Sequence, residues 1–316
     1  MRKLKLQMQI FLVVNFFLLL FITTYGNYQQ NSTTENKNNT SYNNIKIKNY
    51  MVTDTLKAYA LVNGHKIYYE IQGTGQPVIV LHGGFGNTEL YTPNVAALVK
   101  NYKVITVDMQ GHGRTADIDR PLVPDSIAND IAALIKQLNL GKTNIIGYSL
   151  GGSVALRLAI QQPELLQKVV LISCTFKRKG WFPDLLAQQD QMGPASAEAL
   201  KQTPMYQSYL KLAPKPDDWT KLVTKMSVFL QKDYDWSKEV AAIKLPVLLV
   251  AADADGVMPG HMVEFFKLLG GGLKDAGWDG TGRPASQLAI IPGETHYTLF
   301  MSPALSDVIK PFLNKN

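Results

Sequence analysis

Short apolar runs recur along the chain from about residue 56 onward, and segments with helical spacing separate most of them. Unbroken apolar runs of this length are typical of strands that are buried on both faces of a sheet. Segment 126–138 repeats apolar residues every three or four positions, which predicts a helix with one buried side. The expected strands are 58–62, 66–71, 77–81, 104–107, 143–146, 168–173, 246–250 and 287–291. This alternation predicts an α/β fold, with a mostly parallel sheet covered by helices on both faces.

Two stretches interrupt the alternation. Segment 175–243 is mostly helical in pattern and lies before a predicted strand, as expected for a helical lid; it holds Trp181, Trp219 and Trp236. These aromatic residues either pack a small core of the lid itself or line an apolar substrate pocket beneath it. The second stretch, 270–284, is rich in glycine and leads into the amino end of the last strand. It is therefore expected on the face opposite the chemistry.

The first 55 residues differ in composition from the rest of the chain. Arg2, Lys3 and Lys5 precede an apolar stretch, 10–22, which is shorter than the roughly 20 residues that cross a bilayer. This pattern predicts a signal peptide over residues 1–26 and an exported protein, with an uncleaved N-terminal membrane anchor as the alternative. Residues 27–55, rich in Asn, Gln, Ser and Thr, are expected to form a flexible tether. Residues 56–316 then form the folded domain.

The charge of the chain argues against nucleic acid as a partner. The net charge is +7, but residues 1–56 hold six Lys or Arg against two acidic residues, leaving +3 for the remainder. No basic stripe with interleaved aromatics occurs in the body. A hydrophobic content of 46% fits a globular domain with a sizeable core. Nucleotide binding is not expected either, because the glycines at 83–86 miss the required spacing.

The motif Gly147-Tyr148-Ser149-Leu150-Gly151 carries the chemistry. It lies between the strand predicted for 143–146 and a helical run at 152–160, which identifies a G-x-S-x-G nucleophile elbow. Glycine at 147 and 151 lets the strand and the helix approach closely around a strained serine. The helix begins beneath Ser149, so its free N–H groups face any negative charge that forms there. Ser149 is the predicted nucleophile.

A serine hydroxyl requires a base, and the base requires a carboxylate. His296 follows the last predicted strand, on a loop that reaches over the strand ends, and is the expected base. Asp255 lies just past the strand 246–250 beside Gly256 and is the expected acid, with Asp253 as the alternative. The other histidines have less suitable positions, which are a hairpin turn for His65, a strand end for His82, a glycine turn for His112 and a helical run for His261.

A developing oxyanion requires N–H donors that already point toward it. The amide of Leu150, directly after the nucleophile, is one expected donor. The second is expected from the loop after Leu81, where glycines let the backbone approach the substrate. Gly84 is the predicted residue and Phe85 the alternative, and the Phe85 ring is also a candidate to line the acyl site. No two histidines lie at metal-ligand spacing with a carboxylate, so neither a metal nor another cofactor is expected.

With these residues placed, segment 56–313 resembles the α/β-hydrolase fold family, in particular its small lid-bearing serine esterases and lactonases. The resemblance rests on His82-Gly83, the turn 108–114, the elbow, and the pair Asp255 and His296. The turn 108–114 is similar to the family's Asp-x-Arg-Gly-His-Gly-x-Ser, with Gln110 for Arg and Thr115 for Ser. The glycine-rich stretch 270–284 departs from the family pattern.

The resemblance implies a serine hydrolase that cleaves a carboxylic ester or lactone of a small to medium, partly apolar substrate. The same three residues would also serve a carbon–carbon bond hydrolase or an aminopeptidase. A secreted binding protein on an inactive hydrolase scaffold is the alternative of another class. A small-molecule ester is the expected partner, and a membrane would be contacted only through an uncleaved leader.

Overall fold

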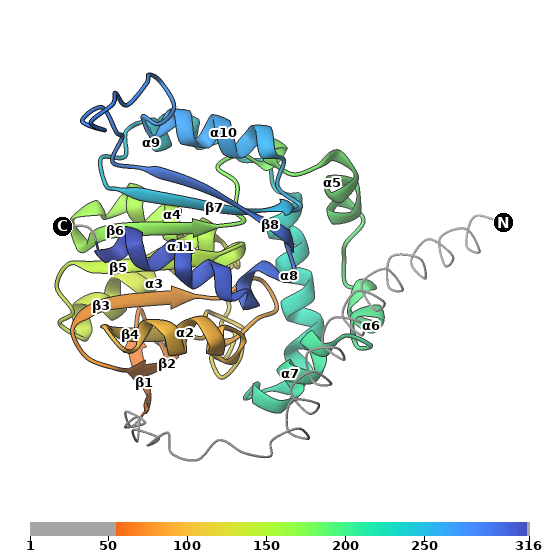
Figure 1. Cartoon of the computed structure of the whole chain (residues 1–316). Helices are drawn as coiled ribbons and strands as arrows, with labels where there is room; N and C mark the ends of the chain where they lie inside the picture. Colours follow the sequence, from red (N-terminus) through yellow and green to blue (C-terminus); the bar gives the residue numbers. More distant parts are fainter. Residues whose placement is uncertain (1–54, 315–316) are drawn as a thin grey trace, which may run out of the picture.

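A computed structural model describes residues 55–314, so the predicted leader and all but the last residue of the predicted tether lie outside it. One eight-stranded sheet, in the order β1-β2-β4-β3-β5-β6-β7-β8, runs through the described part (Figure 1). The strands are β1 (Leu56–Val62), β2 (His65–Gln72), β3 (Gln76–Leu81), β4 (Tyr102–Val107), β5 (Thr143–Tyr148), β6 (Leu166–Ile172), β7 (Val247–Ala254) and β8 (Gln287–Thr295). They match the strands predicted from the sequence, with shifted ends.

The first two strands are the antiparallel edge of this sheet. β1 pairs with β2, and β2 with β4, in antiparallel register, while strands β3 to β8 are all parallel. The β1–β2 hairpin turns at Asn63 and Gly64, which both have positive φ, 47° and 83°. Two such residues make the tight turn that suits the strand twist, and Asn-Gly is the pair that adopts it most readily. His65 is the first residue of β2 rather than a turn residue.

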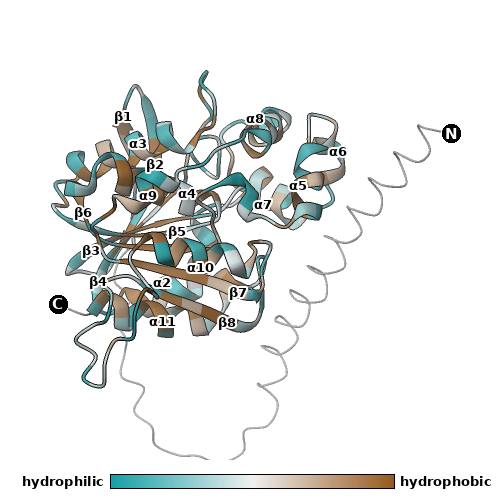
Figure 2. Ribbon diagram, turned by 90° about the horizontal axis from the view of Figure 1, so that it is seen from above, coloured by the Kyte–Doolittle hydropathy of each residue, from teal (hydrophilic) through white to brown (hydrophobic). Residues whose placement is uncertain are grey.

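Helices cover both faces of the sheet, so the predicted fold class is confirmed. Successive residues of β3 point to opposite sides: Ile79 and Leu81 join one core and Val78 and Val80 the other. Helices α3 (Pro124–Gln137), α4 (Leu150–Gln161) and α10 (Pro259–Leu268) close the first core, and α2 (Thr92–Leu98) and α11 (Pro303–Asn314) close the second. Figure 2 shows that the strands between these layers are mainly hydrophobic, as strands buried on both faces must be.

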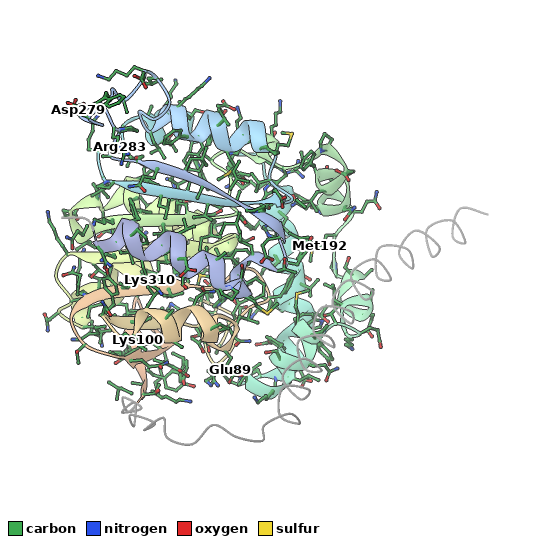
Figure 3. All side chains as sticks on the ribbon, viewed as in Figure 1. Glu89, Lys100, Met192, Asp279, Arg283 and Lys310 are labelled. Carbon is green, nitrogen blue, oxygen red and sulfur yellow. The ribbon has the colours of Figure 1, made fainter. Side chains whose placement is uncertain are left out.

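Residues 175–243, here called the insertion, connect β6 to β7 and carry five short helices. These are α5 (Pro183–Asp190), α6 (Ser196–Leu200), α7 (Pro204–Leu212), α8 (Trp219–Gln231) and α9 (Ser237–Ala241). Met192 of the insertion and Arg283 of the segment before β8 lie at opposite ends of the molecule (Figure 3). The insertion therefore lies over the carboxyl ends of the parallel strands, and the glycine-rich segment lies at their amino ends, as the sequence predicted.

Salt bridges and packing fix the insertion to the body. Lys225 of α8 bonds to both carboxylate oxygens of Asp117, at 2.9 and 2.7 Å, and to two carbonyl groups of the same loop. Trp219 is buried and contacts the rings of Tyr206, Tyr209 and Phe85. Trp219, Tyr206 and Tyr209 thus form a small core within the insertion, and Trp219 also contacts Phe85 in the loop after β3. Within residues 55–314, no helix combines the length and apolarity needed to cross a membrane.

Candidate active site

Ser149 occupies a strained turn between β5 and α4. Its φ of 53° and ψ of −113° are unfavourable for a residue with a side chain, and its N–H donates to the Ile172 carbonyl at 2.9 Å. A Cβ at position 147 would lie 2.1 Å from the Gly151 carbonyl oxygen, and one at 151 would lie 2.5 Å from the Leu81 and His82 carbonyls. Glycine at position 147 therefore lets β5 approach α4 closely, as expected. Glycine at position 151 lets α4 approach the end of β3, a neighbouring strand.

The structure brings Ser149, His296 and Asp255 together. His296 Nε2 lies 3.2 Å from Ser149 Oγ, and His296 Nδ1 lies 2.8 Å from Asp255 Oδ1. A carboxylate can only accept, so Nδ1 carries a proton that it donates to Asp255. Neutral His296 then has its lone pair on Nε2, facing the serine hydroxyl. This is the tautomer that a general base at Ser149 requires.

Four donors hold the Asp255 carboxylate. In addition to His296, its oxygens accept from the Ser173 hydroxyl at 2.5 Å and from the backbone N–H groups of Ala252 and Val257 at 3.2 and 3.1 Å. Burial alone would raise the pKa of Asp255, but the hydrogen bonds and the facing His296 outweigh it and hold that pKa below its usual value of 3.8. Asp255 thus stays ionised and able to stabilise a positive imidazole.

Ser173 is a site residue that the sequence analysis missed. It follows β6 as Ser149 follows β5, it is fully buried, and it has a positive φ of 49°. Its N–H donates to the Val250 carbonyl at 2.8 Å, and its hydroxyl reaches the acid. The only signal in the sequence was a polar residue at the end of a predicted strand next to the elbow strand.

Aromatic rings hold the His296 loop in place. The Tyr148 hydroxyl donates to the His296 carbonyl, and the Tyr148 ring lies 5.2 Å from the imidazole, centroid to centroid. Trp181 of the insertion meets the same imidazole edge to face at 5.4 Å. One tryptophan of the insertion, Trp181, therefore lies beside the candidate base, while Trp219 packs in the core of the insertion. Residue 148 of the elbow also has a structural role that its motif position did not reveal.

The candidate oxyanion donors are backbone amides of the loop after β3 and of the first residue of α4. Within residues 55–314, the backbone N–H groups of Gly84, Phe85 and Leu150 donate to no protein acceptor. Leu150 begins α4, where the first N–H groups of a helix lack partners. Phe85 has a positive φ of 60° and Gly84 does not, and a Cβ at position 84 would lie 2.6 Å from Met226 Cε of α8. Gly84 and Leu150 remain the predicted pair, with Phe85 as the alternative.

His82 shapes the loop that carries Gly84. Its Nε2 accepts from the Met109 N–H at 3.1 Å, so its Nδ1 carries the proton and donates to the Gly83 carbonyl at 2.7 Å. Burial lowers the pKa of His82 to about 3, so the ring stays neutral and keeps this tautomer. These contacts give His82 a structural role in the loop after β3.

The residues that the sequence analysis set aside lie elsewhere. The exposed Asp253 accepts from the Gly293 N–H at 2.9 Å and so joins the irregular end of β7 to β8. His65, His112 and His261 are buried and bond to Asp130, Gln110 and Phe176 respectively. Among residues 55–314, no cluster of three or more His, Cys, Asp or Glu side chains could hold a metal ion.

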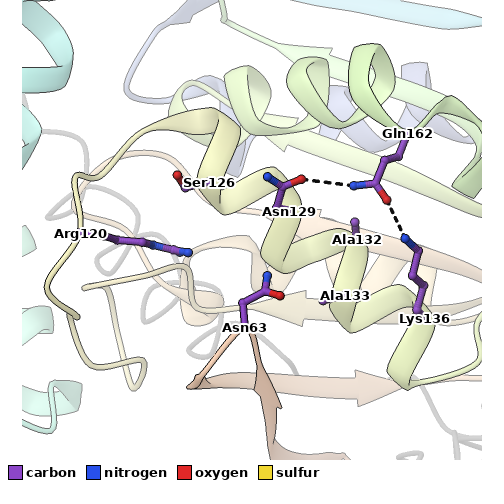
Figure 4. Close-up of a pocket in the computed structure, with 8 residues that line it drawn as sticks. All are labelled: Asn63, Arg120, Ser126, Asn129, Ala132, Ala133, Lys136 and Gln162. Atoms are coloured by element: carbon purple, nitrogen blue, oxygen red, sulfur yellow. Dashed lines mark hydrogen bonds between the residues drawn. The ribbon is translucent and has the colours of Figure 1, made fainter.

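A polar surface pocket of about 480 Å³ lies away from Ser149, His296 and Asp255. It is lined by the β1–β2 turn, by α3 and by residues on either side of that helix (Figure 4). Gln162 in this pocket donates to Asn129 at 3.3 Å and accepts from Lys136 at 2.8 Å, and Arg120 is paired with buried Asp130. None of the residues that line it is Ser149, His296 or Asp255, so the pocket is no part of the candidate active site.

Known proteins similar to this chain carry the same fold. A family model described as alpha/beta hydrolase fold matches residues 76–204. An (E)-2-((N-methylformamido)methylene)succinate hydrolase of Acinetobacter baylyi is 28% identical over 152 residues, which are 48% of this chain and 54% of the relative. The match thus spans about half of that relative's length.

Solved structures agree over a longer stretch. The crystal structure of an E-2-(acetamidomethylene)succinate hydrolase superposes with a TM-score of 0.65 at 20% identity, covering 83% of this chain and 100% of that one. A Bacillus subtilis carboxylesterase superposes with a TM-score of 0.63 at 19% identity, covering 83% and 92%. Identities this low show a shared fold and leave the substrate open.

Proposed function

Since this chain is an α/β-hydrolase fold protein, we propose that it is a serine hydrolase that cleaves a carboxylic ester or lactone through an acyl-enzyme on Ser149. One observation carries the proposal: His296 connects the strained Ser149, at 3.2 Å, to the buried Asp255, at 2.8 Å. A hydroxyl, a base in the correct tautomer and an ionised acid are the groups that acyl transfer needs.

The reaction follows from these contacts. His296 Nε2 takes the hydroxyl proton as Ser149 Oγ attacks the carbonyl carbon, and Asp255 stabilises the imidazolium that forms. The tetrahedral oxyanion accepts hydrogen bonds from the Leu150 and Gly84 amides, which donate to no other acceptor within residues 55–314. Collapse transfers the Nε2 proton to the leaving alcohol and leaves an acyl ester on Ser149. Water deprotonated by His296 then attacks this ester and releases the acid.

The surroundings of the site favour a partly apolar substrate. Met226 of α8 lies against Gly84, Phe85 packs on Trp219, and Trp181 packs on His296. All three contacts join the insertion to the candidate catalytic loops. We therefore propose that the insertion acts as a lid that covers the acyl group and excludes water from the oxyanion.

The leader predicted from the sequence supports a location outside the cytoplasm. The basic residues and apolar stretch at the start of the chain are those of an export signal, and the polar segment 27–55 would let the domain fold at a distance from it. We propose an exported hydrolase, held at the membrane if the leader is retained.

A substrate panel tests the proposed reaction. The purified chain would be assayed on 4-nitrophenyl acetate, butyrate, octanoate and laurate, a γ-lactone, an amino-acid anilide and a vinylogous 1,5-diketone. We expect turnover of the esters, with best activity on a short or medium acyl group, and none with Ser149→Ala. Turnover of the diketone or the anilide alone would replace the ester proposal by a carbon–carbon bond hydrolase or an aminopeptidase. A folded protein that turns over no panel member would indicate the inactive binding scaffold.

A further inference from the structure

The glycine-rich segment between α10 and β8 lies at the end of the sheet opposite Ser149. β8 is parallel to β7, so the residues that lead into it lie at the amino ends of the strands. Ser149 and Asp255 follow the carboxyl ends of β5 and of β7 instead. The loop that projects between α10 and β8 in Figure 1 is therefore remote from the candidate chemistry, and its features require another explanation.

Hydrogen bonds within this segment build a defined turn. The Gly282 N–H donates to the Ala276 carbonyl at 2.8 Å, and the Gly280 N–H to the Gly277 carbonyl at 3.0 Å. Gly277 and Gly280 have positive φ angles of 78° and 71°, which glycine adopts without strain. This turn presents Trp278, whose exposed fraction is 106%, so the loop holds its indole entirely in water.

Trp278 has an apolar neighbour in the same segment. Leu273 is 69% exposed, and these two are the most exposed large hydrophobic side chains of residues 55–314. A single exposed leucine is ordinary, but an ordered turn in the same segment that presents a fully exposed indole marks a surface for interaction. A tryptophan side chain combines a large apolar ring with an N–H donor, which suits the boundary between lipid and water.

The first strand of the described part also begins at the amino ends of the parallel strands. β1 is antiparallel to β2, and β2 is antiparallel to β4, so β1 runs in the direction of the parallel strands. Leu56 therefore enters the domain at the amino-end face, which also carries Trp278. The 55 residues that precede it include the basic group and the apolar stretch 10–22. A membrane that holds this leader would therefore be connected to the domain through this end.

Exposed cations outnumber exposed carboxylates in the loops that lead into the parallel strands. The cations are Lys100, Lys142, Lys244, Lys274 and Arg283, and the carboxylates are Glu164, Asp275 and Asp279. Lys100 and Arg283 mark this face in Figure 3. Asp279 is further engaged, because it accepts from the Thr281 N–H at 3.1 Å and hydroxyl at 2.9 Å. A surface of this charge is attracted to anionic lipid headgroups.

We propose that the amino-end face of the domain docks on an anionic lipid bilayer, with the Trp278 and Leu273 side chains inserted at the level of the headgroups. The domain then lies on the membrane with Ser149 and the insertion turned toward water. This arrangement gives the glycine-rich segment a function, since the length and the glycines of the turn project its tryptophan beyond the body.

Tryptophan fluorescence of the full chain tests the docking. The emission of the wild-type chain and of Trp278→Phe would be recorded with vesicles of phosphatidylcholine and phosphatidylglycerol, with and without brominated acyl chains. The difference between the two proteins reports Trp278 alone. We expect this difference spectrum to shift to shorter wavelength on vesicles and to lose most of its intensity with brominated lipid. Vesicles of phosphatidylcholine alone should give a smaller shift.

Trp236→Phe is the matched control. Trp236 belongs to the insertion, where its ring stacks on Tyr234 and lies under the Arg157 guanidinium of α4. This substitution should leave the vesicle-induced shift intact. If the chain sediments with vesicles while the Trp278 emission stays unchanged, the leader alone holds the protein and the docking proposal is wrong. Failure of the chain to sediment with vesicles would also contradict it. So would formation of a dimer that buries Trp278 in the absence of lipid.

Discussion

Residues 55–314 contain two buried histidine–aspartate pairs, and one of the two faces a serine. His296 and Asp255 lie 2.8 Å apart, and His65 and Asp130 lie 3.1 Å apart. Both carboxylates have a pKa held below the usual value of 3.8, in each case because hydrogen bonds outweigh the effect of burial. A histidine paired with a buried, ionised acid is therefore not enough to identify a catalytic base.

The difference between the pairs lies in what surrounds them. The second nitrogen of His296 faces Ser149, while the second nitrogen of His65 is buried without a partner. Asp130 also accepts hydrogen bonds from Arg120 and Asn63, so a fixed positive charge already compensates it. Asp255 has only neutral donors and the imidazole itself. The first pair can stabilise a charge that appears during reaction, and the second holds α3 to the β1–β2 hairpin.

The largest expected effect is a difference in kcat between the variants of the two histidines. His296→Ala and Ser149→Ala should each lower kcat by about 10⁶, because no other group can activate or replace the nucleophile. His65→Ala should leave kcat within about twofold and lower the free energy of unfolding by about 1–3 kcal/mol, since it removes a partner of buried Asp130. Steady-state kinetics and urea unfolding of the three variants measure both quantities. A His65→Ala protein that is folded but inactive would overturn the assignment of roles.

Substitutions of the two aspartates should show the same division between activity and stability, with a smaller loss of kcat. Asp255→Asn removes the acceptor that fixes the tautomer of His296, and kcat should fall by about 10⁴. Asp130→Asn should preserve kcat and cost about 3 kcal/mol of stability, because it leaves Arg120 without its buried partner. The kcat and the urea midpoint of both variants would be measured. A large loss of kcat in Asp130→Asn, together with an unchanged kcat in Asp255→Asn, would contradict the comparison.

Ser173 extends the comparison to the support of the acid. Ser173→Ala removes the 2.5 Å hydrogen bond to Asp255 and should lower kcat by about tenfold. Ser173→Gly removes the same bond but accepts the positive φ more readily, so it should match the alanine variant in kcat and exceed it in stability. Equal kcat values for wild type and both variants would reduce Ser173 to a packing role.

The smallest expected effect is a pH dependence of stability that comes from Asp130, the partner of His65. The pKa of Asp130 is lower in the folded protein than its usual 3.8, so its contribution to stability is present above that value and is lost as pH falls through the folded pKa. Urea unfolding from pH 5 down to pH 2 should therefore show a decline below about pH 3.8 that is shallower in Asp130→Asn. An equal slope in the two proteins would contradict the ionised state of Asp130.

The sequence predicted the parts of the site that local pattern determines. The glycines around Ser149, the strand before it and the helix after it define the elbow within a few residues, and the parallel strand pattern places His296 and Asp255 at the same edge. The roles of Ser173 and Tyr148 depend on contacts with residues 82 and 148 positions away, which no local pattern records. The pairing of His65 with Asp130 was missed for the same reason.

The most direct test of the central claim is labelling of the purified chain with a fluorophosphonate probe, followed by peptide mass mapping. In this reaction an activated serine oxygen displaces fluoride and forms a stable phosphonyl ester. We expect one adduct, on Ser149, in the wild type and in His65→Ala, and none in His296→Ala. An adduct that persists in His296→Ala, or its loss in a folded His65→Ala protein, would contradict the account. So would a folded wild-type protein that takes up no label.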